Sequence, residues 1–172
     1  MKKMEISKII IIVCYLFLPH FVFADAVKSA DQLILISISN RIIQFYENGE
    51  LKKQYKIAVG KKQTPTPVGN GYIYKKRKQP IFRYVDEGPK KGEIIRWSRI
   101  DNGKLVKIPY KKMRALAFRI NGHKTDKYSI HSTTEKNSIG KAVSNGCVRM
   151  KIKDLLELYP LVKKGAKVII NQ

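Results

Sequence analysis

The sequence predicts a mainly β fold, either a sandwich or a partly open barrel, with one or two short helices. Three observations support this class. Apolar residues recur in short runs that alternate with polar ones, as in half-buried strands. Turn-forming residues separate these runs. Only residues 153–159 have the apolar spacing of a convincing helix. The chain has 172 residues, which allows one domain with a hydrophobic core.

The first predicted elements form a hairpin. Residues 33–38 and 41–46 are rich in β-branched and aromatic residues, which favour strands. Asn48-Gly49 follows them, and this pair readily takes the positive φ angles of a type I′ turn. The return strand is expected over residues 51–59. Residues 64–69 hold two prolines, which exclude pairing in a central strand, so we expect an extended segment there.

The second half of the predicted domain has a less regular pattern. A strand begins at residues 72–74, and residues 75–112 are basic and rich in Pro and Gly. We expect the latter to be loops and a hairpin inserted between core strands, where substrate-contacting segments commonly lie. The remaining predicted elements are strands over 116–120 and 128–131, a helix over 153–159 that Pro160 helps to end, and a strand over 166–170.

Residues 1–24 have the layout of a secretory signal peptide. Lysines precede an apolar run over residues 9–18, and small or apolar residues follow it. The run is shorter than the roughly 20 residues that span a bilayer. Cleavage is expected after Ala24, with Ala26 as the second choice. We therefore expect a domain over residues 25–172 that is exported to the periplasm or cell envelope and meets a membrane only through an uncleaved signal.

Two cysteines occur in the chain, and Cys14 belongs to the predicted signal peptide. Cys147 would then be the sole thiol of the exported domain, which could form no internal disulfide in a compartment that permits them. A lone cysteine there is a liability unless it is buried or used. No histidine or cysteine pair has zinc-binding spacing, so we expect neither a metal nor a cofactor.

The chain is strongly basic, with 35 Lys+Arg against 13 Asp+Glu and a net charge of +22. Such a charge favours polyanions through long-range attraction and counterion release. Export makes intracellular nucleic acid an unexpected partner, so the expected partners are anionic cell-envelope polymers or membrane surfaces. The alternative, for most of these lysines, is a simple solvated surface.

A thiol and an imidazole form the candidate catalytic pair. Cys147 lies among small residues, and His131 ends a predicted core strand sixteen positions earlier. An imidazole can take the proton of a thiol, whose ordinary pKa is about 8.5, and so activate it as a nucleophile. Gly146 permits a tight turn whose N–H groups, with that of Cys147, are candidate oxyanion donors. Arg149 can bind a substrate carboxylate. His123 is an alternative base, but it lies in a predicted turn.

Four segments of the chain resemble the signature of the YkuD-type L,D-transpeptidases. They are Thr66-Pro67-Val68-Gly69, Ile130-His131-Ser132-Thr133, Ser138-Ile139-Gly140 and Val143-Ser144-Asn145-Gly146-Cys147-Val148-Arg149-Met150. The similarity extends over most of residues 31–171 and is loosest over 75–112. Taken together, these motifs are highly specific for the family.

The resemblance implies the β-rich catalytic fold of that family, a peptidoglycan substrate, and a place in cell-wall organisation and cell shape. It implies Cys147 as the nucleophile and His131 as the base. Ser132 matches the position whose backbone carbonyl orients the histidine, and Gly146 matches the oxyanion turn. The expected substrate-binding residues are Arg149, Asn145 and Ser144.

The reaction that the resemblance implies begins with attack of the thiolate on the carbonyl between meso-diaminopimelate and the terminal D-alanine of a tetrapeptide stem. D-alanine leaves and an acyl-enzyme thioester remains. An amine acceptor then gives an L,D-transpeptidase, whereas water gives an L,D-carboxypeptidase. The same resemblance implies acylation by carbapenems.

Asn145 departs from the commonest form of the family, which has histidine at this position. An asparagine side chain forms hydrogen bonds but does not titrate. We expect the change to affect acceptor specificity and turnover more than the class of reaction. The departure and the net charge also leave a second hypothesis, a catalytically silent module that binds the cell wall. A general cysteine hydrolase is a third.

Overall fold

The structure is a computed structural model, and its described residues are 30–81, 89, 98–101, 104–107, 110–123 and 127–172. The predicted signal peptide over residues 1–24 lies outside them, as does most of the segment 82–109.

The described elements follow one another along the chain as strands interrupted by short helices. They are β1 (Gln32–Ser37), β2 (Ile42–Glu47), β3 (Glu50–Lys56), β4 (Val59–Gly60), β5 (Gly69–Lys78), β6 (Ser98–Asp101), β7 (Lys104–Lys107), the 3-10 helix η2 (Tyr110–Lys112), β8 (Arg114–Ile120), β9 (Ser129–Thr133), the 3-10 helix η3 (Lys136–Ser138), β10 (Ala142–Ser144), β11 (Val148–Lys151), α2 (Ile152–Leu161) and β12 (Lys167–Asn171).

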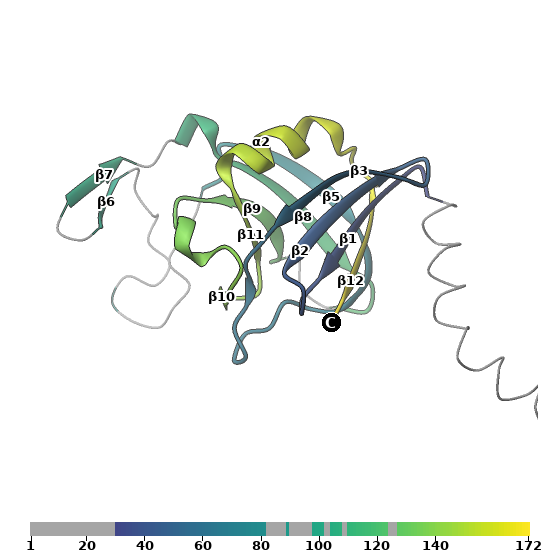
Figure 1. Ribbon diagram of the computed structural model, residues 1–172, viewed down its shortest axis with the longest axis horizontal. Helices are drawn as coiled ribbons and strands as arrows, with labels where there is room; N and C mark the ends of the chain where they lie inside the picture. Colours follow the sequence, from purple (N-terminus) through teal and green to yellow (C-terminus); the bar gives the residue numbers. More distant parts are fainter. Residues whose placement is uncertain (1–29, 82–88, 90–97, 102–103, 108–109, 124–126) are drawn as a thin grey trace, which may run out of the picture.

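Eight strands form one curled sheet in the order β11-β9-β8-β5-β12-β1-β2-β3 (Figure 1). Its two edges are joined just beyond the end of β3. The N–H of Ala58 donates to the carbonyl of Arg149 at 2.9 Å, and the N–H of Arg149 donates back to Ala58 at 2.9 Å. These two bonds nearly close the sheet into a barrel, and the predicted mainly β fold is confirmed as a barrel rather than a sandwich.

The core lies inside this barrel. Alternate residues of each strand point inward, such as Ile34 in β1 and Leu116 and Phe118 in β8, and all three are fully buried. Helix α2 lies across one end of the barrel (Figure 1) and contacts β8, β9 and β11. Its residues Leu155 and Leu158 belong to the same buried cluster. Burial of this apolar surface is the main stabilising term for the fold.

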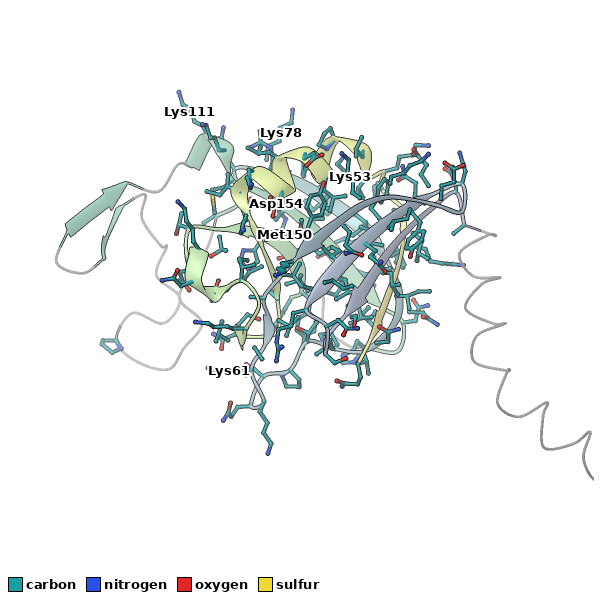
Figure 2. All side chains as sticks on the ribbon, in the orientation of Figure 1. Lys53, Lys61, Lys78, Lys111, Met150 and Asp154 are labelled. Atoms are coloured by element: carbon teal, nitrogen blue, oxygen red, sulfur yellow. The ribbon has the colours of Figure 1, made fainter. Side chains whose placement is uncertain are left out.

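Basic side chains lie at both ends of the molecule. Figure 2 shows Lys61 at one end of the molecule and Lys78 and Lys111 at the other, whereas Met150 lies in the interior. No helix among the described residues is both long enough and apolar enough to span a bilayer.

The predicted hairpin is confirmed, but the predicted extent of its return strand is wrong. Asn48 and Gly49 have φ angles of 51° and 81°, as a type I′ turn requires. The single strand expected over residues 51–59 is two strands, β3 and β4. The chain leaves β2 after residue 56, because the backbone beyond it bonds to the segment before Cys147: Val59 donates to Lys141 at 3.1 Å, and β4 pairs with β10.

Two other boundaries differ from expectation. Strand β5 continues to Lys78 and pairs with β8 along its length, so residues 75–78 belong to the core sheet and not to the insertion. The predicted strand ended too early, because the basic residues at its end lack the apolar alternation of a strand and are mostly exposed to solvent. A hairpin within the insertion is present as β6 and β7. Helix α2 includes Pro160 and ends one residue after it, at Leu161.

The close approach of β5 and β8 gives a first prediction. A Cβ atom at Gly71 would lie 1.8 Å from the carbonyl oxygen of Arg119, although the φ angle of Gly71 is one that any residue adopts. We expect Gly71→Ala to lower the free energy of unfolding by about 2 to 3 kcal/mol through this overpacking. Urea unfolding followed by circular dichroism measures the change.

Gly122→Ala is the matched control for Gly71→Ala. Gly122 has a φ angle of +79°, and a Cβ atom added there would have nothing within 4 Å, so only backbone strain is introduced. That strain costs about 1 kcal/mol. Equal losses for the two variants would contradict the steric explanation for Gly71.

Candidate active site

The turn that presents Cys147 connects β10 to β11, and its shape depends on Gly146. The φ angle of Gly146 is +98°, which disfavours any residue with a side chain. A Cβ atom at this position would also lie 2.7 Å from Cε1 of Tyr128 and 3.2 Å from the carbonyl oxygen of Pro65. Backbone conformation and lack of space therefore both require glycine immediately before the cysteine.

Ser144 holds the turn together from inside. Its hydroxyl donates to the carbonyl of Cys147 at 2.5 Å and accepts from the N–H of Gly146 at 3.2 Å. The residue is 1% exposed, and its hydroxyl is used within the turn, so the expected substrate contact of Ser144 stays a prediction that these contacts do not favour. Because the N–H of Gly146 is used within the turn, the expected pair of oxyanion donors is reduced to the N–H of Cys147.

The segment after β4 packs against this turn and involves Asn145. Lys61 donates its N–H to the carbonyl of Ser144 at 2.9 Å. The hydroxyl of Thr64 lies 3.2 Å from the same carbonyl and 3.4 Å from Oδ1 of Asn145. Thr66, from the Thr-Pro-x-Gly motif, accepts the N–H of Gly60 at 2.8 Å. Asn145 is predicted from the sequence to bind substrate, and these contacts indicate that its side chain also shapes the turn.

His131 lies beside the cysteine turn because β9 and β11 pair in parallel, with His131 opposite Arg149. Its Nδ1 is 3.0 Å from the carbonyl oxygen of Ser132. A carbonyl only accepts, so we assign the ring proton to Nδ1, which leaves Nε2 as an acceptor for the thiol proton. The carbonyl of Ser132 therefore lies where the predicted orienting group should be. The hydroxyl of Ser132 instead accepts the N–H of Arg114 at 3.1 Å.

The thiol of Cys147 is half-buried and free, and its environment favours the thiolate. Burial raises the pKa of Cys147. A hydrogen bond and the charge of His131, together with hydrogen bonds from Ser129, lower this pKa by more than burial raises it, so the net pKa lies below the ordinary value. A lowered pKa increases the thiolate fraction near neutral pH. The pair can therefore supply a nucleophile and a base.

Ser129 is a site residue that the sequence interpretation missed. Its hydroxyl lies 3.8 Å from Sγ of Cys147, within the range of a hydrogen bond to sulfur. The same sulfur lies 3.8 Å from the carbonyl oxygen of Lys127. Ser129 is two residues before His131 in β9, so both point to the same face. Strand alternation around His131 was the available signal for it.

Arg149, the expected carboxylate anchor, already has an anionic partner. Its Nη1 lies 2.5 Å from Oε2 of Glu135, and the arginine side chain is mostly buried while that of the glutamate is half-exposed. A substrate carboxylate at Arg149 must share or displace this contact. Nothing in the sequence pattern pointed to Glu135, because the pair is made across the gap between a loop and β11.

His123, the alternative base, contacts the ring of Tyr128 edge-on, with ring centroids 6.3 Å apart. The histidine whose hydrogen bond and charge lower the pKa of Cys147 is His131. Among the described residues, no three His, Cys, Asp or Glu side chains converge as a metal site would require.

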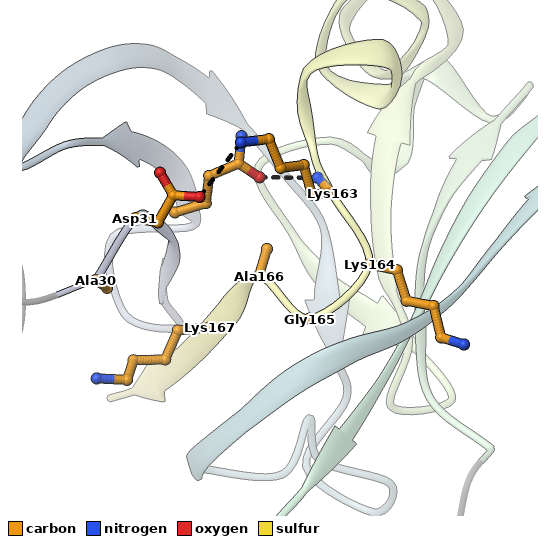
Figure 3. A pocket seen from close by; sticks show the side chains of 8 residues that line it. Ala30, Asp31, Lys163, Lys164, Gly165, Ala166 and Lys167 are labelled. Atoms are coloured by element: carbon orange, nitrogen blue, oxygen red, sulfur yellow. Dashed lines mark hydrogen bonds and ion pairs between the residues drawn. The ribbon is translucent and has the colours of Figure 1, made fainter.

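A pocket of about 360 Å³ lies away from these groups, at the start of the domain. It is lined by residues 30–32 and 163–167 (Figure 3). Within it Lys163 pairs with Asp31 at 3.3 Å, and the N–H of Lys163 donates to Gln32 at 2.8 Å. It contains no predicted catalytic or substrate-binding residue.

Comparison with known sequences gives a consistent family. A model of the YkuD family, described as the L,D-transpeptidase catalytic domain, matches residues 31–170. The chain is 32% identical over 139 residues to YkuD of Bacillus subtilis strain 168, covering 81% of this chain and 65% of that protein. It is 25% identical over 144 residues to YqjB of the same strain, covering 82% and 72%. Both carry L,D-transpeptidase in their names. The chain spans about two thirds of the length of its YkuD relatives.

Solved structures show the same fold. A crystal structure of an Enterococcus faecium L,D-transpeptidase has a TM-score of 0.60 and 20% identity, covering 82% of this chain and 50% of that chain. L,D-transpeptidase 3 from Mycobacterium tuberculosis has a TM-score of 0.62 and 16% identity, covering 83% of this chain and 62% of that chain. The catalytic domain of an E. faecium L,D-transpeptidase has a TM-score of 0.53 and 20% identity, covering 83% of this chain and 98% of that chain. The predicted catalytic-type fold is confirmed.

The contacts at sulfur give a second prediction. We expect Ser129→Ala to raise the pKa of Cys147, because it removes a donor to the thiolate. His131→Gln should raise it further, since the histidine supplies the larger lowering contributions. The rate of alkylation by iodoacetamide as a function of pH reports this pKa when residues 25–172 are used, because this part of the chain contains one thiol.

Ser132→Ala is the control on the same strand. It removes a hydroxyl that bonds to Arg114 but keeps the carbonyl that holds His131. The thiol pKa should stay at the wild-type value. An unchanged pKa in Ser129→Ala would remove Ser129 from the site.

Proposed function

Because the chain belongs to the YkuD family of L,D-transpeptidase catalytic domains, we propose that it is an exported, cysteine-dependent peptidoglycan L,D-transpeptidase. It forms an acyl-enzyme at the diaminopimelate–D-alanine bond of a tetrapeptide stem and passes the acyl group to an amine. The observation that supports this most directly is the pairing of Cys147 with His131, whose ring is held by the carbonyl of Ser132.

In the acylation step, the thiolate of Cys147 attacks the carbonyl carbon, and the proton of the thiol resides on Nε2 of His131. The N–H of Cys147 stabilises the negative charge that develops on the carbonyl oxygen. When the intermediate collapses, the C–N bond breaks and His131 gives its proton to the amine of the departing D-alanine. A thioester and neutral His131 remain.

In the second step, an amine attacks the thioester and His131 accepts its proton. The new amide forms as the C–S bond breaks and the thiolate of Cys147 returns. Water in place of the amine gives an L,D-carboxypeptidase through the same groups, and this is the alternative activity. Asn145 belongs to the turn rather than to the base, so its effect on either acceptor acts through the position of Cys147.

A silent module that binds the wall is the second candidate function. The net charge of +22 supports it, and so does the spread of lysines over both ends of the molecule (Figure 2). A binding module needs no activated thiol, however. The net lowering of the Cys147 pKa favours the enzyme: desolvation raises this pKa, and the contributions of His131 and Ser129 together lower it below the ordinary value.

The third prediction concerns the nucleophile. A disaccharide-tetrapeptide incubated with the domain should lose D-alanine, and Cys147→Ala should reduce this loss by at least about 1,000-fold, as expected when a nucleophile is removed. Mass spectrometry of the products measures both. Adding an acceptor amine distinguishes the activities: an amide adduct indicates a transpeptidase, and a tripeptide alone indicates a carboxypeptidase. Equal D-alanine release by Cys147→Ala would falsify the proposal.

The fourth prediction separates the enzyme from the silent module. A carbapenem at neutral pH should acylate Cys147 in a one-to-one adduct visible in the intact mass, and His131→Gln should slow its formation because the thiolate fraction falls. The silent module instead predicts binding to purified cell walls that weakens with salt and no adduct. A disulfide-exchange reagent provides the control that the thiol is accessible.

A further inference from the structure

Four neighbouring strands bring cations to the face that contains the catalytic pair. In β5, β8, β9 and β11, Arg77 pairs with Ala115, Ala115 with His131, and His131 with Arg149. Directly paired residues in adjacent strands project from the same face of a sheet. These strands lie side by side in Figure 1. Arg77 therefore projects from the outer face that also presents His131.

A second row lies next to the first. Lys75 of β5 pairs with Ala117 of β8, which pairs with Ser129 of β9, the residue whose hydroxyl contacts the sulfur of Cys147. Adjacent strands are about 4.8 Å apart, so two strand spacings separate these lysine and serine backbones by roughly 10 Å. An extended lysine or arginine side chain covers much of that distance.

A β-bulge determines that these two residues face outward. The pairing of β5 with β8 shifts between Ile73 and Lys75, so Tyr74 is the extra residue. Ile73 points into the core, and without the bulge Lys75 and Arg77 would follow it. Lys76 shows the inversion independently, because its Nζ reaches inward to the carbonyl of Val162 at 2.6 Å. Bulges commonly redirect side chains beside active sites.

Lys75 and Arg77 are also available to a ligand. Both are exposed, and neither makes a hydrogen bond or ion pair with any described residue. Arg149 differs, since Glu135 already balances its charge. The residues between the cations and the catalytic pair are Ala115 and Ala117, and each is only 3% exposed. A ligand is therefore reached by the ends of the two long cationic side chains and not by the surface of strand β8.

We propose that Lys75 and Arg77 form a subsite that binds a carboxylate of the stem peptide while its scissile carbonyl lies at Cys147. This rests on the proposed function and adds a specificity element to it. A stem has carboxylates in addition to the reacting carbonyl, and charge-assisted hydrogen bonds to them are stronger than neutral ones. Lys75 and Arg77 supply positive charge that no acidic side chain among the described residues balances, whereas Glu135 balances that of Arg149.

The test compares two substrates and two variants. The substrates are the disaccharide-tetrapeptide and the same compound with its free carboxyl groups amidated. Lys75→Gln/Arg77→Gln should lower kcat/KM for the first by about tenfold, mostly through KM, as expected for the loss of one charge-assisted contact. On the amidated substrate the variant and the wild type should be equal.

Lys52→Gln/Lys53→Gln is the matched control. It removes the same net charge from β3, on the hairpin side of the barrel, where both lysines make solvent-exposed ion pairs of little energetic value. It should leave kcat/KM unchanged on both substrates. An equal loss in the two double variants, or a loss at β5 that persists on the amidated substrate, overturns the subsite.

The outcomes also separate this subsite from the proposed function. Wild-type turnover with an unaffected Lys75→Gln/Arg77→Gln variant rejects the subsite and leaves the enzyme intact. A wild-type protein that releases no D-alanine from either substrate rejects the function, and the subsite with it.

Discussion

The backbone of residues 57–61 is the constraint on which the rest of the site depends. The carbonyl of Ile57 accepts the N–H of Gly140, and Ala58 and Arg149 each donate an N–H to the carbonyl of the other. The N–H of Val59 donates to the carbonyl of Lys141, and the N–H of Lys61 donates to that of Ser144. The same contacts close the sheet and fix both sides of the turn around Cys147. The barrel and the nucleophile are therefore positioned by one set of hydrogen bonds, and neither can shift without the other.

This rigidity matters because the thiolate is held in a partly desolvated place. Burial alone raises the pKa of Cys147, so the site must supply compensating donors, and it takes them from His131 and Ser129 on one strand. Strand β9 is central between β11 and β8, so its side chains have little freedom to turn away. Preorganised donors cost no reorganisation when charge develops, and this is the main way in which proteins stabilise charged intermediates.

Sequence patterns were sufficient to select Cys147, His131 and Gly146, which the structure brings together at one turn. These residues could be selected because a thiol, an imidazole and a glycine at a tight turn have few other uses together. The hairpin at Asn48-Gly49 was predictable for a similar reason, since its conformation is local.

The parts that sequence patterns missed depend on pairing between distant segments. Ser144 looked like a substrate residue, but its hydroxyl is used inside the turn. Glu135 meets Arg149 only because a loop folds over β11. The predicted return strand was too long, because the backbone from Ala58 onward bonds to residues on both sides of Cys147 and no longer to β2. Register and partner exchange are tertiary properties, and period-two alternation does not encode them.

Under the proposed function, positive charge acts on the stem peptide at two distances in this protein. Screening limits the direct influence of a charge to about 8 to 10 Å, so lysines at the two ends of the molecule, such as Lys61 and Lys111 (Figure 2), affect encounter and not orientation. Orientation requires charges on the catalytic face itself. There the extra residue at Tyr74 exchanges the two faces of β5, which turns Lys75 and Arg77 outward and Lys76 inward to helix α2. One inserted residue thus decides which basic side chains of β5 lie on the face of the catalytic pair, where the proposed subsite requires them.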